Sequence, residues 1–205
     1  MHPNPAFRQA PAERALAFAR ERGFGVLTVA APEGVLAAHL PFVLERERVA
    51  AHLVRSNPLT RALKAGPMQA LLIVSGADGY VSPDWYGEAE SVPTWNYVAV
   101  HLRGTLELIN ESLLRAHLER LSANFEERLA PKPPWRIDKM EPEGLAKKLR
   151  QIVPVEMTVE SVESTFKLNQ NRSERARAGA AAALAAGGTP GLETEALAAL
   201  MQEAD

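Results

Sequence analysis

The sequence predicts a mainly β fold with peripheral helices (α+β), built as a closed or split antiparallel barrel of about seven strands. Three consecutive segments, residues 24–31, 35–44 and 49–54, are rich in β-forming residues and are separated by short polar turns. Two such hairpins in a row indicate an antiparallel sheet. A long aromatic and β-branched segment at residues 96–109 and an alternating one at residues 152–162 add further strands.

The second predicted strand has two distinguishable faces, because side chains alternate along a strand. One face carries only apolar residues, which we assign to the core: Leu36, Ala38, Leu40, Phe42 and Leu44. His39 points to the opposite face, and His52 does the same on the third strand. This second face is also partly apolar, so we expect a helix, a partner subunit or a ligand to cover it.

The other elements follow from turn and helix signals. Helices are expected at residues 11–22, 58–64, 111–129, 143–150, 175–186 and 193–201. Short strands are expected at residues 69–75, 79–82 and 165–168. Asn110 is placed to cap the helix at residues 111–129. The predicted apolar stripe of that helix is Leu113, Leu114, Leu118 and Leu121.

The composition changes sharply after Arg172. Residues 175–186 are rich in alanine, with Leu184 as the one large apolar residue, so this helix is expected to form on propensity more than on packing. We therefore predict a barrel domain at residues 1–172 and an alanine-rich helical extension at residues 173–205.

The 205-residue chain has a formal net charge of −2 and contains no cysteine. The charge gives no electrostatic footprint for nucleic acid over the whole chain. The lack of cysteine excludes disulfides, thiolate metal sites and cysteine nucleophiles. The sequence shows no secretory signal and no apolar run of the roughly 18 residues that a membrane span needs. We therefore expect a cytoplasmic protein.

Aromatic residues concentrate between Gly79 and Gly104, a stretch that holds two of the three Trp and all three Tyr. Pro83, Gly87 and Pro93 mark a loop of roughly a dozen residues there, which is longer than a plain hairpin needs. Large flat side chains with polar tips suit a planar ligand or a subunit interface. A satellite aromatic cluster under a long loop is the structural alternative.

The junction Arg55-Ser56-Asn57-Pro58 is a candidate phosphate site. It lies between a predicted strand and a predicted helix, where the first backbone amides are unpaired and the helix dipole is positive. The adjacent arginine adds a charge-assisted contact. The alternative is an ordinary helix capped by Ser56 or Asn57.

Three strand histidines, His39, His52 and His101, form a second candidate. Three His side chains can bind a metal in a barrel. However, no His-x-His or His-Glu-x-x-His spacing supports one, and we expect none. Hydrogen-bonded strand histidines or polar contacts to a ligand are the other interpretations. The polar run from Lys167 to Arg172 is either a contact for an anionic ligand or a solvated turn.

Five segments resemble the PaiB family, also called FMN-binding negative transcriptional regulators. They occur in the family order at residues 38–41, 52–58, 80–86, 92–101 and 167–173. The segment Val-Pro-Thr-Trp-Asn-Tyr-Val-Ala-Val-His at residues 92–101 is highly specific. The resemblance covers about residues 6–175, and Asn169 replaces the serine that is usual in the family.

The resemblance implies a flavin-reductase-like split barrel, related to pyridoxamine-phosphate oxidases, that forms a homodimer with FMN at the interface. It implies that Arg55, Ser56 and Asn57 hold the FMN phosphate. The other contacts it implies, from the ribityl chain to the ring, are His39, His52, Trp95, Asn96, Lys167 and Gln170. The last two would approach the pyrimidine edge, where a cation favours the anionic reduced flavin. Residues 1–172 would then be the FMN-binding domain.

Three functions are compatible with this resemblance. The first is a dimeric regulator that represses transcription, although the sequence has no helix-turn-helix signature and its net charge does not favour DNA. The second is a flavin-dependent oxidoreductase that uses FMN on a small-molecule substrate; fold analogy alone does not identify such a site. The third is a passive flavin-binding or haem-handling split barrel. No catalytic residue is identifiable from spacing.

Overall fold

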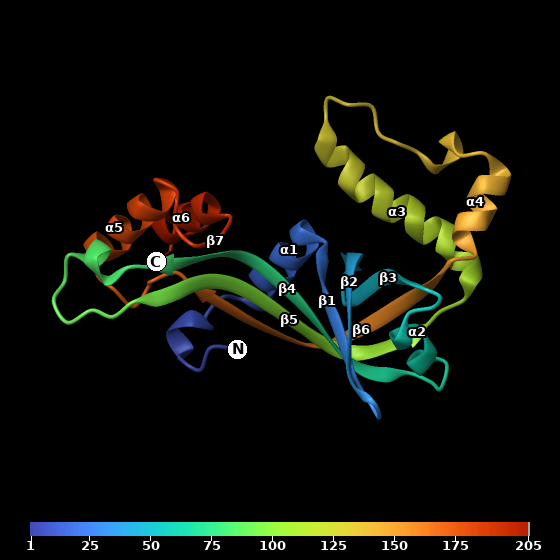
Figure 1. Cartoon of the computed structure of the whole chain (residues 1–205), viewed down its shortest axis with the longest axis horizontal. Coiled ribbons are helices and arrows are strands. Elements are labelled where there is room, and N and C mark those ends of the chain that lie inside the picture. The colour runs from blue at the N-terminus through green and yellow to red at the C-terminus, as the bar shows by residue number, and fades with distance from the viewer. Residues whose placement is uncertain (205) are drawn as a thin grey trace. The chain divides into compact units, whose positions relative to one another are not determined.

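The computed structural model describes residues 1–204 and contains the helices and strands drawn in Figure 1. The strands are β1 (Phe24–Ala31), β2 (Gly34–Glu45), β3 (Arg48–Val54), β4 (Met68–Val81), β5 (Thr94–Leu108), β6 (Ile152–Lys167) and β7 (Gly191–Leu192). The α-helices are α1 (Ala12–Arg22), α2 (Pro58–Leu63), α3 (Leu114–Glu126), α4 (Pro142–Leu149), α5 (Glu174–Ala185) and α6 (Thr194–Gln202). Short 3₁₀ helices are η1 (Pro5–Phe7), η2 (Pro83–Tyr86), η3 (Glu111–Leu113), η4 (Glu127–Leu129) and η5 (Ile137–Lys139). None of the helices in residues 1–204 has the length and apolar character that crossing a membrane requires.

The strands form one sheet in the order β1-β2-β3-β6-β5-β4-β7. Strand β1 also pairs antiparallel with β4, from Val26 opposite Ile73 to Val29 opposite Ala70. Because β1 and β4 meet, six strands close into a barrel, and β7 adds to β4 at Asp78. The predicted antiparallel barrel of about seven strands is confirmed.

Two strands are longer than the sequence predicts. The predicted strands at residues 69–75 and 79–82 are one strand, β4, and those at residues 152–162 and 165–168 are one strand, β6. In β4 the buried residues change from even to odd positions at Gly76 and Ala77, which are both buried. This break in the alternation separates the two halves in the sequence, although the backbone stays extended through it.

Contacts between residues group the chain into two compact units. The first, which we term the barrel unit, comprises residues 16–74 and 101–162. The second, which we term the terminal unit, comprises residues 1–15, 75–100 and 163–205. The boundary that the sequence predicts at residue 172, between an FMN-binding domain and a helical extension, stays a prediction.

The interior of the barrel contains alternate side chains of its strands. The buried residues of β2 and β3 include Ala38, Leu40, Phe42, Leu44, Val49, Ala51 and Leu53. Removing each large apolar side chain of this kind from water contributes about 1.5–3 kcal/mol. The core face predicted for the second strand is therefore confirmed, with Leu36 at its half-buried end.

Helix α3 covers part of the outer face of β2 and β3. Its buried side chains are Leu114, His117 and Leu121. The predicted apolar stripe is therefore partly wrong. Leu113 is 50% exposed because it belongs to the 3₁₀ turn before α3, and His117 occupies the buried position between the two leucines. Of the three coverings expected for this face, the structure shows a helix.

His117 contacts His52 of β3, with 3.2 Å between His52 Nδ1 and His117 Nε2. His117 is only 2% exposed, and burial lowers its pKa to about 4, with smaller contributions from His52 and Arg120. Burial also lowers the pKa of His52. Both rings are therefore neutral near pH 7. One ring donates an N–H to the other in a single hydrogen bond. The Nδ1 atom of His117 is buried and has no hydrogen-bond partner.

In the terminal unit α5 packs against α6 and against η2. Small residues allow this close packing. Ala176, Ala180 and Ala181 are fully buried, and a Cβ added to Gly179 would lie 2.4 Å from the carbonyl oxygen of Trp85. The alanine-rich helix is therefore held by packing as well as by propensity, which corrects the expectation from its composition.

Replacing Gly104 of β5 by alanine should destabilise the barrel. A Cβ at this position would lie 1.8 Å from the carbonyl oxygen of Thr158 in β6, so the two strands would have to separate. We expect Gly104→Ala to lower the free energy of unfolding by about 3 kcal/mol in urea denaturation. The matched control is Gly144→Ala in α4, which has no atom within 4 Å and should gain about 0.5–1 kcal/mol. Equal stability of the two variants would contradict the close contact of β5 and β6.

The His52–His117 contact should make stability depend on pH. The pKa of His117 is about 4 in the folded protein, against 6.5 for an unperturbed histidine. The unfolded chain therefore binds more protons between these values, and stability is lost as the pH falls through this interval. Urea denaturation at about pH 7 and about pH 4.5 should show a smaller loss for His117→Leu than for the wild type. An equal loss in both proteins would contradict this account.

Candidate functional site

The residues that the sequence predicts for a cofactor site fall into two groups. The barrel unit contains His39, His52, Arg55, Ser56 and Asn57, and the terminal unit contains Trp95, Asn96, Lys167 and Gln170. Within each group the side chains differ in their exposure and in their hydrogen bonds. Some of these side chains are exposed at the surface, whereas others are already engaged in holding the chain together.

Arg55 follows the last residue of β3 and uses all three guanidinium nitrogens. Its two terminal nitrogens donate to the two carboxylate oxygens of Glu111 at 2.8 Å each. Its Nε donates to the carbonyl oxygen of Arg150 at 2.9 Å, and Nη2 also donates to that of Ile152 at 3.2 Å. The hydrogen bond from Arg55 lowers the pKa of Glu111. Arg55 therefore joins β3, η3 and the start of β6.

The neighbouring residues differ in how they are engaged. The Asn57 side chain accepts a hydrogen bond from the backbone N–H of Leu59 at 2.9 Å and so caps α2. Ser56 is exposed beside it. Asn57 thus forms the ordinary helix cap that was the alternative to a phosphate site. The adjacent Arg55 pairs with the carboxylate of Glu111.

The histidines of the barrel unit are not gathered into one site. His52 faces His117, whereas His39 is exposed on β2, with its ring centre 6.5 Å from that of Phe24. His117 is absent from the sequence prediction, although its place between Leu114 and Leu121 on one helical face is the signal that could have revealed it. Among residues 1–204 no group of three His, Cys, Asp or Glu side chains is arranged to hold a metal ion.

Lys167 ends β6 in the terminal unit. Its Nζ donates to Thr94 Oγ1 and, at 2.8 Å, to the carbonyl oxygen of Trp95. It also lies 5.8 Å from the centre of the Phe7 ring. Burial lowers the pKa of Lys167. Lys167 therefore lies against the backbone of Trp95, and the contacts of both residues with a flavin stay a prediction.

Trp95 and Asn96 face opposite sides of β5, because successive side chains of a strand alternate. The Trp95 side chain is 42% exposed and packs edge-on against Tyr80, with 6.3 Å between ring centres. Asn96 is fully buried; its Nδ2 donates to Met201 Sδ at 3.4 Å, and its Oδ1 has no hydrogen-bond partner. These two side chains are therefore not brought together on one surface.

Gln170 holds the turn that follows β6. Its Oε1 accepts from the backbone N–H of Leu168 at 2.8 Å. Its Nε2 donates to the carbonyl oxygens of Phe166 at 2.6 Å and Ala6 at 3.2 Å. All of its polar groups are thus used inside the terminal unit.

The same turn contains a polar cluster that the sequence analysis did not assign. Asn169 has a backbone φ of 62°, in the left-handed region where Asn is tolerated better than most residues. Its Nδ2 donates to the Tyr86 hydroxyl at 3.4 Å, and the Arg172 guanidinium lies 4.6 Å from the centre of the Tyr86 ring. Arg172 also pairs with Glu88 at 3.5 Å. The cluster joins the turn between β6 and α5 to η2 and to the loop after it.

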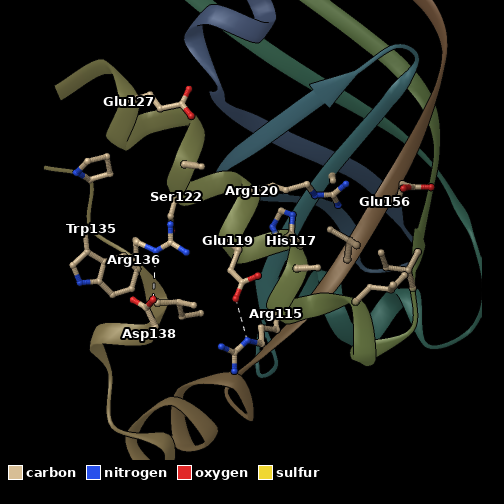
Figure 2. Close-up of a pocket in the computed structure, with 18 residues that line it drawn as sticks. Arg115, His117, Glu119, Arg120, Ser122, Glu127, Trp135, Arg136, Asp138 and Glu156 are labelled. Atoms are coloured by element: carbon tan, nitrogen blue, oxygen red, sulfur yellow. Dashed lines mark hydrogen bonds and ion pairs between the residues drawn. The ribbon is translucent and has the colours of Figure 1, made fainter. Parts of the chain in front are cut away.

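A cavity of about 820 Å³ lies in the barrel unit, which we term the α3 cavity (Figure 2). Its walls are formed by α3, by residues 134–138 and by side chains of β3 and β6. The residues that bear on its chemistry are Arg115, His117, Arg120, Trp135, Arg136 and Asp138. No local pattern in the sequence indicates this cavity, because its walls come together only in the fold.

The donor set at Arg55 is compatible with a flavin phosphate. Two coplanar N–H donors already hold paired anionic oxygens, those of Glu111, and the Ser56 hydroxyl is exposed alongside. Phosphate offers the same paired oxygens to an arginine fork. Within the terminal unit, Lys167 is a cationic side chain that donates to the carbonyl oxygen of the exposed Trp95.

Comparisons with known proteins agree with this geometry. The family described as "Putative FMN-binding domain" matches residues 1–161. Over 172 residues the chain is 30% identical to protease synthase and sporulation protein PAI 2 of Bacillus subtilis, covering 82% of this chain and 81% of that protein.

Solved structures show the same fold at low sequence identity. The FAD and heme binding protein from Mycobacterium smegmatis aligns with a TM-score of 0.58 and 18% identity, over 78% of this chain and 73% of that one. The flavocytochrome Anf3 from Azotobacter vinelandii aligns with a TM-score of 0.56 and 20% identity, over 81% and 72%. Together with the split-barrel topology, the family match shows that this chain belongs to the PaiB family of FMN-binding split-barrel proteins, with a flavin as its cofactor.

Proposed function

We propose that FMN binds to the barrel unit with its phosphate on Arg55 and Ser56. Within the terminal unit we propose Lys167 and Trp95 as contacts for a flavin ring, as the family resemblance implies. The observation that supports this proposal is the bidentate ion pair between Arg55 and Glu111. A phosphate can replace that carboxylate on the two terminal nitrogens. Meanwhile the bonds from Arg55 to the carbonyl oxygens of Arg150 and Ile152 keep the guanidinium in place.

We propose that most of the other predicted site residues support the site indirectly and that His39 contacts the flavin directly. Asn57 and Gln170 make hydrogen bonds within the protein, and Asn96 is fully buried with its Nδ2 on Met201 Sδ, so we propose that these three residues support the site and do not touch the flavin. His52 acts in the same way, through its contact with His117. His39, which is exposed, remains a direct contact for the ribityl chain.

Bound FMN supplies one- and two-electron redox chemistry. Lys167 provides a fixed positive charge, held by Thr94 and the Trp95 carbonyl oxygen. A cation near the pyrimidine edge stabilises negative charge on the reduced ring and so raises the tendency of the flavin to accept electrons.

We also propose that the protein acts as a homodimer. Phe24 and Val35, on the hairpin of β1 and β2, are 49% and 75% exposed, and Phe24 lies beside His39. A second copy covering these side chains would remove apolar surface from water. This arrangement would place His39 at the subunit interface, where the family resemblance expects FMN.

The biological role that we propose is negative regulation of transcription in the cytoplasm, which rests on the resemblance to the PaiB family. The net charge of −2 does not favour phosphate contacts with DNA, so the proposed regulation is indirect. Residues 173–205, with α5 and α6, are proposed as an extension outside the FMN-binding domain.

Arg55→Ala should weaken FMN binding. Loss of a charge-assisted phosphate contact costs roughly 1.5–3 kcal/mol, which corresponds to an increase in Kd of about 10–150-fold. Fluorescence titration of FMN into the full-length protein measures this directly, because flavin emission changes on binding.

The matched control is Arg48→Ala, which removes an exposed arginine at the other end of β3, one that pairs with Glu156. It should leave the Kd for FMN unchanged. Because Arg55 also joins β3 to β6, the unfolding midpoint of each variant has to be measured in parallel. An unchanged Kd in a folded Arg55→Ala protein would remove Arg55 from the site.

A further inference from the structure

The α3 cavity includes none of the residues proposed for FMN, and its volume of about 820 Å³ is within the range of small-molecule sites. Every residue of its lining belongs to the barrel unit. One wall is formed by α3 and its flanking turns, and residues 134–138 face that wall (Figure 2). The accessible side chains on these two walls determine which ligand the cavity accepts.

Trp135 gives the cavity an accessible flat apolar surface. The Glu126 carboxylate accepts from the backbone N–H of Trp135 at 2.7 Å and also binds Lys132 Nζ, so this part of the wall is held in place. The Trp135 side chain is nevertheless 37% exposed, and Leu113 of the same lining is 50% exposed. An aromatic ligand that covers these side chains gains from apolar burial and from contact with the indole.

Arg136 brings unused hydrogen-bond donors to the same cavity. Its Nε donates to Asp138 Oδ2 at 3.4 Å, a long contact, while its two terminal nitrogens have no partner in residues 1–204. The side chains of Arg136 and Asp138 are 76% and 64% exposed, so this ion pair is weak and screened by water. Figure 2 shows the Arg136 guanidinium directed toward α3. Its terminal nitrogens are therefore available to a ligand between the two walls.

Ser122 adds a donor from the opposite wall. It lies on α3, lines the cavity and is half-buried, and its hydroxyl makes no hydrogen bond to any residue of the described chain. A guanidinium has only donors, and a serine hydroxyl can donate as well. The group that suits both is a carboxylate, which only accepts and offers two oxygens to the arginine fork.

The acidic side chains of the lining do not oppose such an anion at this point. Glu119 pairs with Arg115 at 3.0 Å, and Glu156 pairs with an arginine of β3. Glu127 has no ion pair among residues 1–204. Figure 2 shows its carboxylate directed away from Arg136, at the end of the helical segment. The carboxylate of a ligand at Arg136 therefore meets no unpaired acidic group beside it.

We propose that the α3 cavity binds an aromatic carboxylate, with its ring system against Trp135 and its carboxylate on the terminal nitrogens of Arg136 and the hydroxyl of Ser122. This is a second small-molecule site, separate from the residues proposed for the flavin phosphate. The ring contact follows from the accessible indole, and the charge of the ligand follows from the three donors without partners.

The test is equilibrium dialysis of the full-length protein, with and without FMN, against three naphthalene probes. 2-Naphthoate carries the carboxylate, 2-naphthamide has the same shape without the charge, and 2-naphthylmethylammonium carries the opposite charge. We expect one site per chain and an affinity for 2-naphthoate about tenfold higher than for 2-naphthamide, the ratio that a hydrogen bond to a charged group provides. 2-Naphthylmethylammonium should bind more weakly than either.

Three variants locate the two halves of the ligand. Arg136→Gln should weaken 2-naphthoate about tenfold and remove its advantage over 2-naphthamide. Ser122→Ala should weaken 2-naphthoate about threefold, because a neutral donor contributes less than a charged one. Trp135→Ala should weaken both probes about tenfold through the loss of the aromatic contact.

The matched control is Arg61→Gln. Arg61 is exposed on α2 of the same unit, outside the cavity, and its replacement removes the same charge. It should leave all three affinities unchanged, so an equal loss in Arg61→Gln and Arg136→Gln would indicate general attraction of anions and overturn the site. Unfolding midpoints measured in parallel identify any variant that does not fold.

Other outcomes also overturn the proposal. Equal affinities for 2-naphthoate and 2-naphthamide, or tighter binding of the ammonium probe, would contradict the role of Arg136. Binding that survives Trp135→Ala would place the ring elsewhere, and displacement of FMN by 2-naphthoate would place the probe in the flavin site. Because dialysis without FMN tests this site by itself, failure of flavin binding in the wild type leaves the result readable, and the two proposals fail separately.

Discussion

The pairing of β1 with β4 is the constraint on which the barrel depends. It joins Val26 to Ile73 and Val29 to Ala70, and so closes six strands into a ring in which the barrel strands have no free edge. A closed ring has one interior face, filled by alternate apolar side chains, and one exterior face. The exterior face of β2 and β3 then has to be covered, and α3 covers part of it, with Leu114, His117 and Leu121 buried and His117 in contact with His52.

The contacts of Arg55 depend on another pairing in the same ring, that of β3 with β6. Strand β3 pairs with β6 from Arg48 opposite Thr158 to Val54 opposite Ile152, so the end of β3 lies next to the start of β6. The Arg55 guanidinium can therefore reach the carbonyl oxygens of Arg150 and Ile152 while its outer edge faces Glu111. The two carbonyl oxygens hold the Arg55 guanidinium in position while its terminal nitrogens pair with the Glu111 carboxylate. An anionic ligand could take the place of that carboxylate without a change in the barrel.

Local patterns in the sequence predicted most of the fold. Residue types and alternation place β1, β2 and β3 and the core face of Phe42, and Asn110 caps the helical segment before α3 through the backbone N–H of Ser112. The site is harder to predict, because its contacts join residues far apart in the chain. Nothing in the local sequence shows that Glu111 forms an ion pair with Arg55 or that His117 contacts His52. By contrast, the alternation of side chains along a strand is enough to show that Trp95 and Asn96 face opposite sides of β5. The family resemblance implied a flavin contact for both residues.

The measurement that tests this account most directly is the absorbance spectrum of the purified full-length protein after incubation with FMN and gel filtration. We expect flavin absorption to elute with the protein, at one flavin per chain. Addition of NADH or NADPH afterwards distinguishes a bound flavin that turns over from one that is only held. A protein that elutes without flavin after incubation with excess FMN would contradict the central claim that this barrel is a flavin-binding protein.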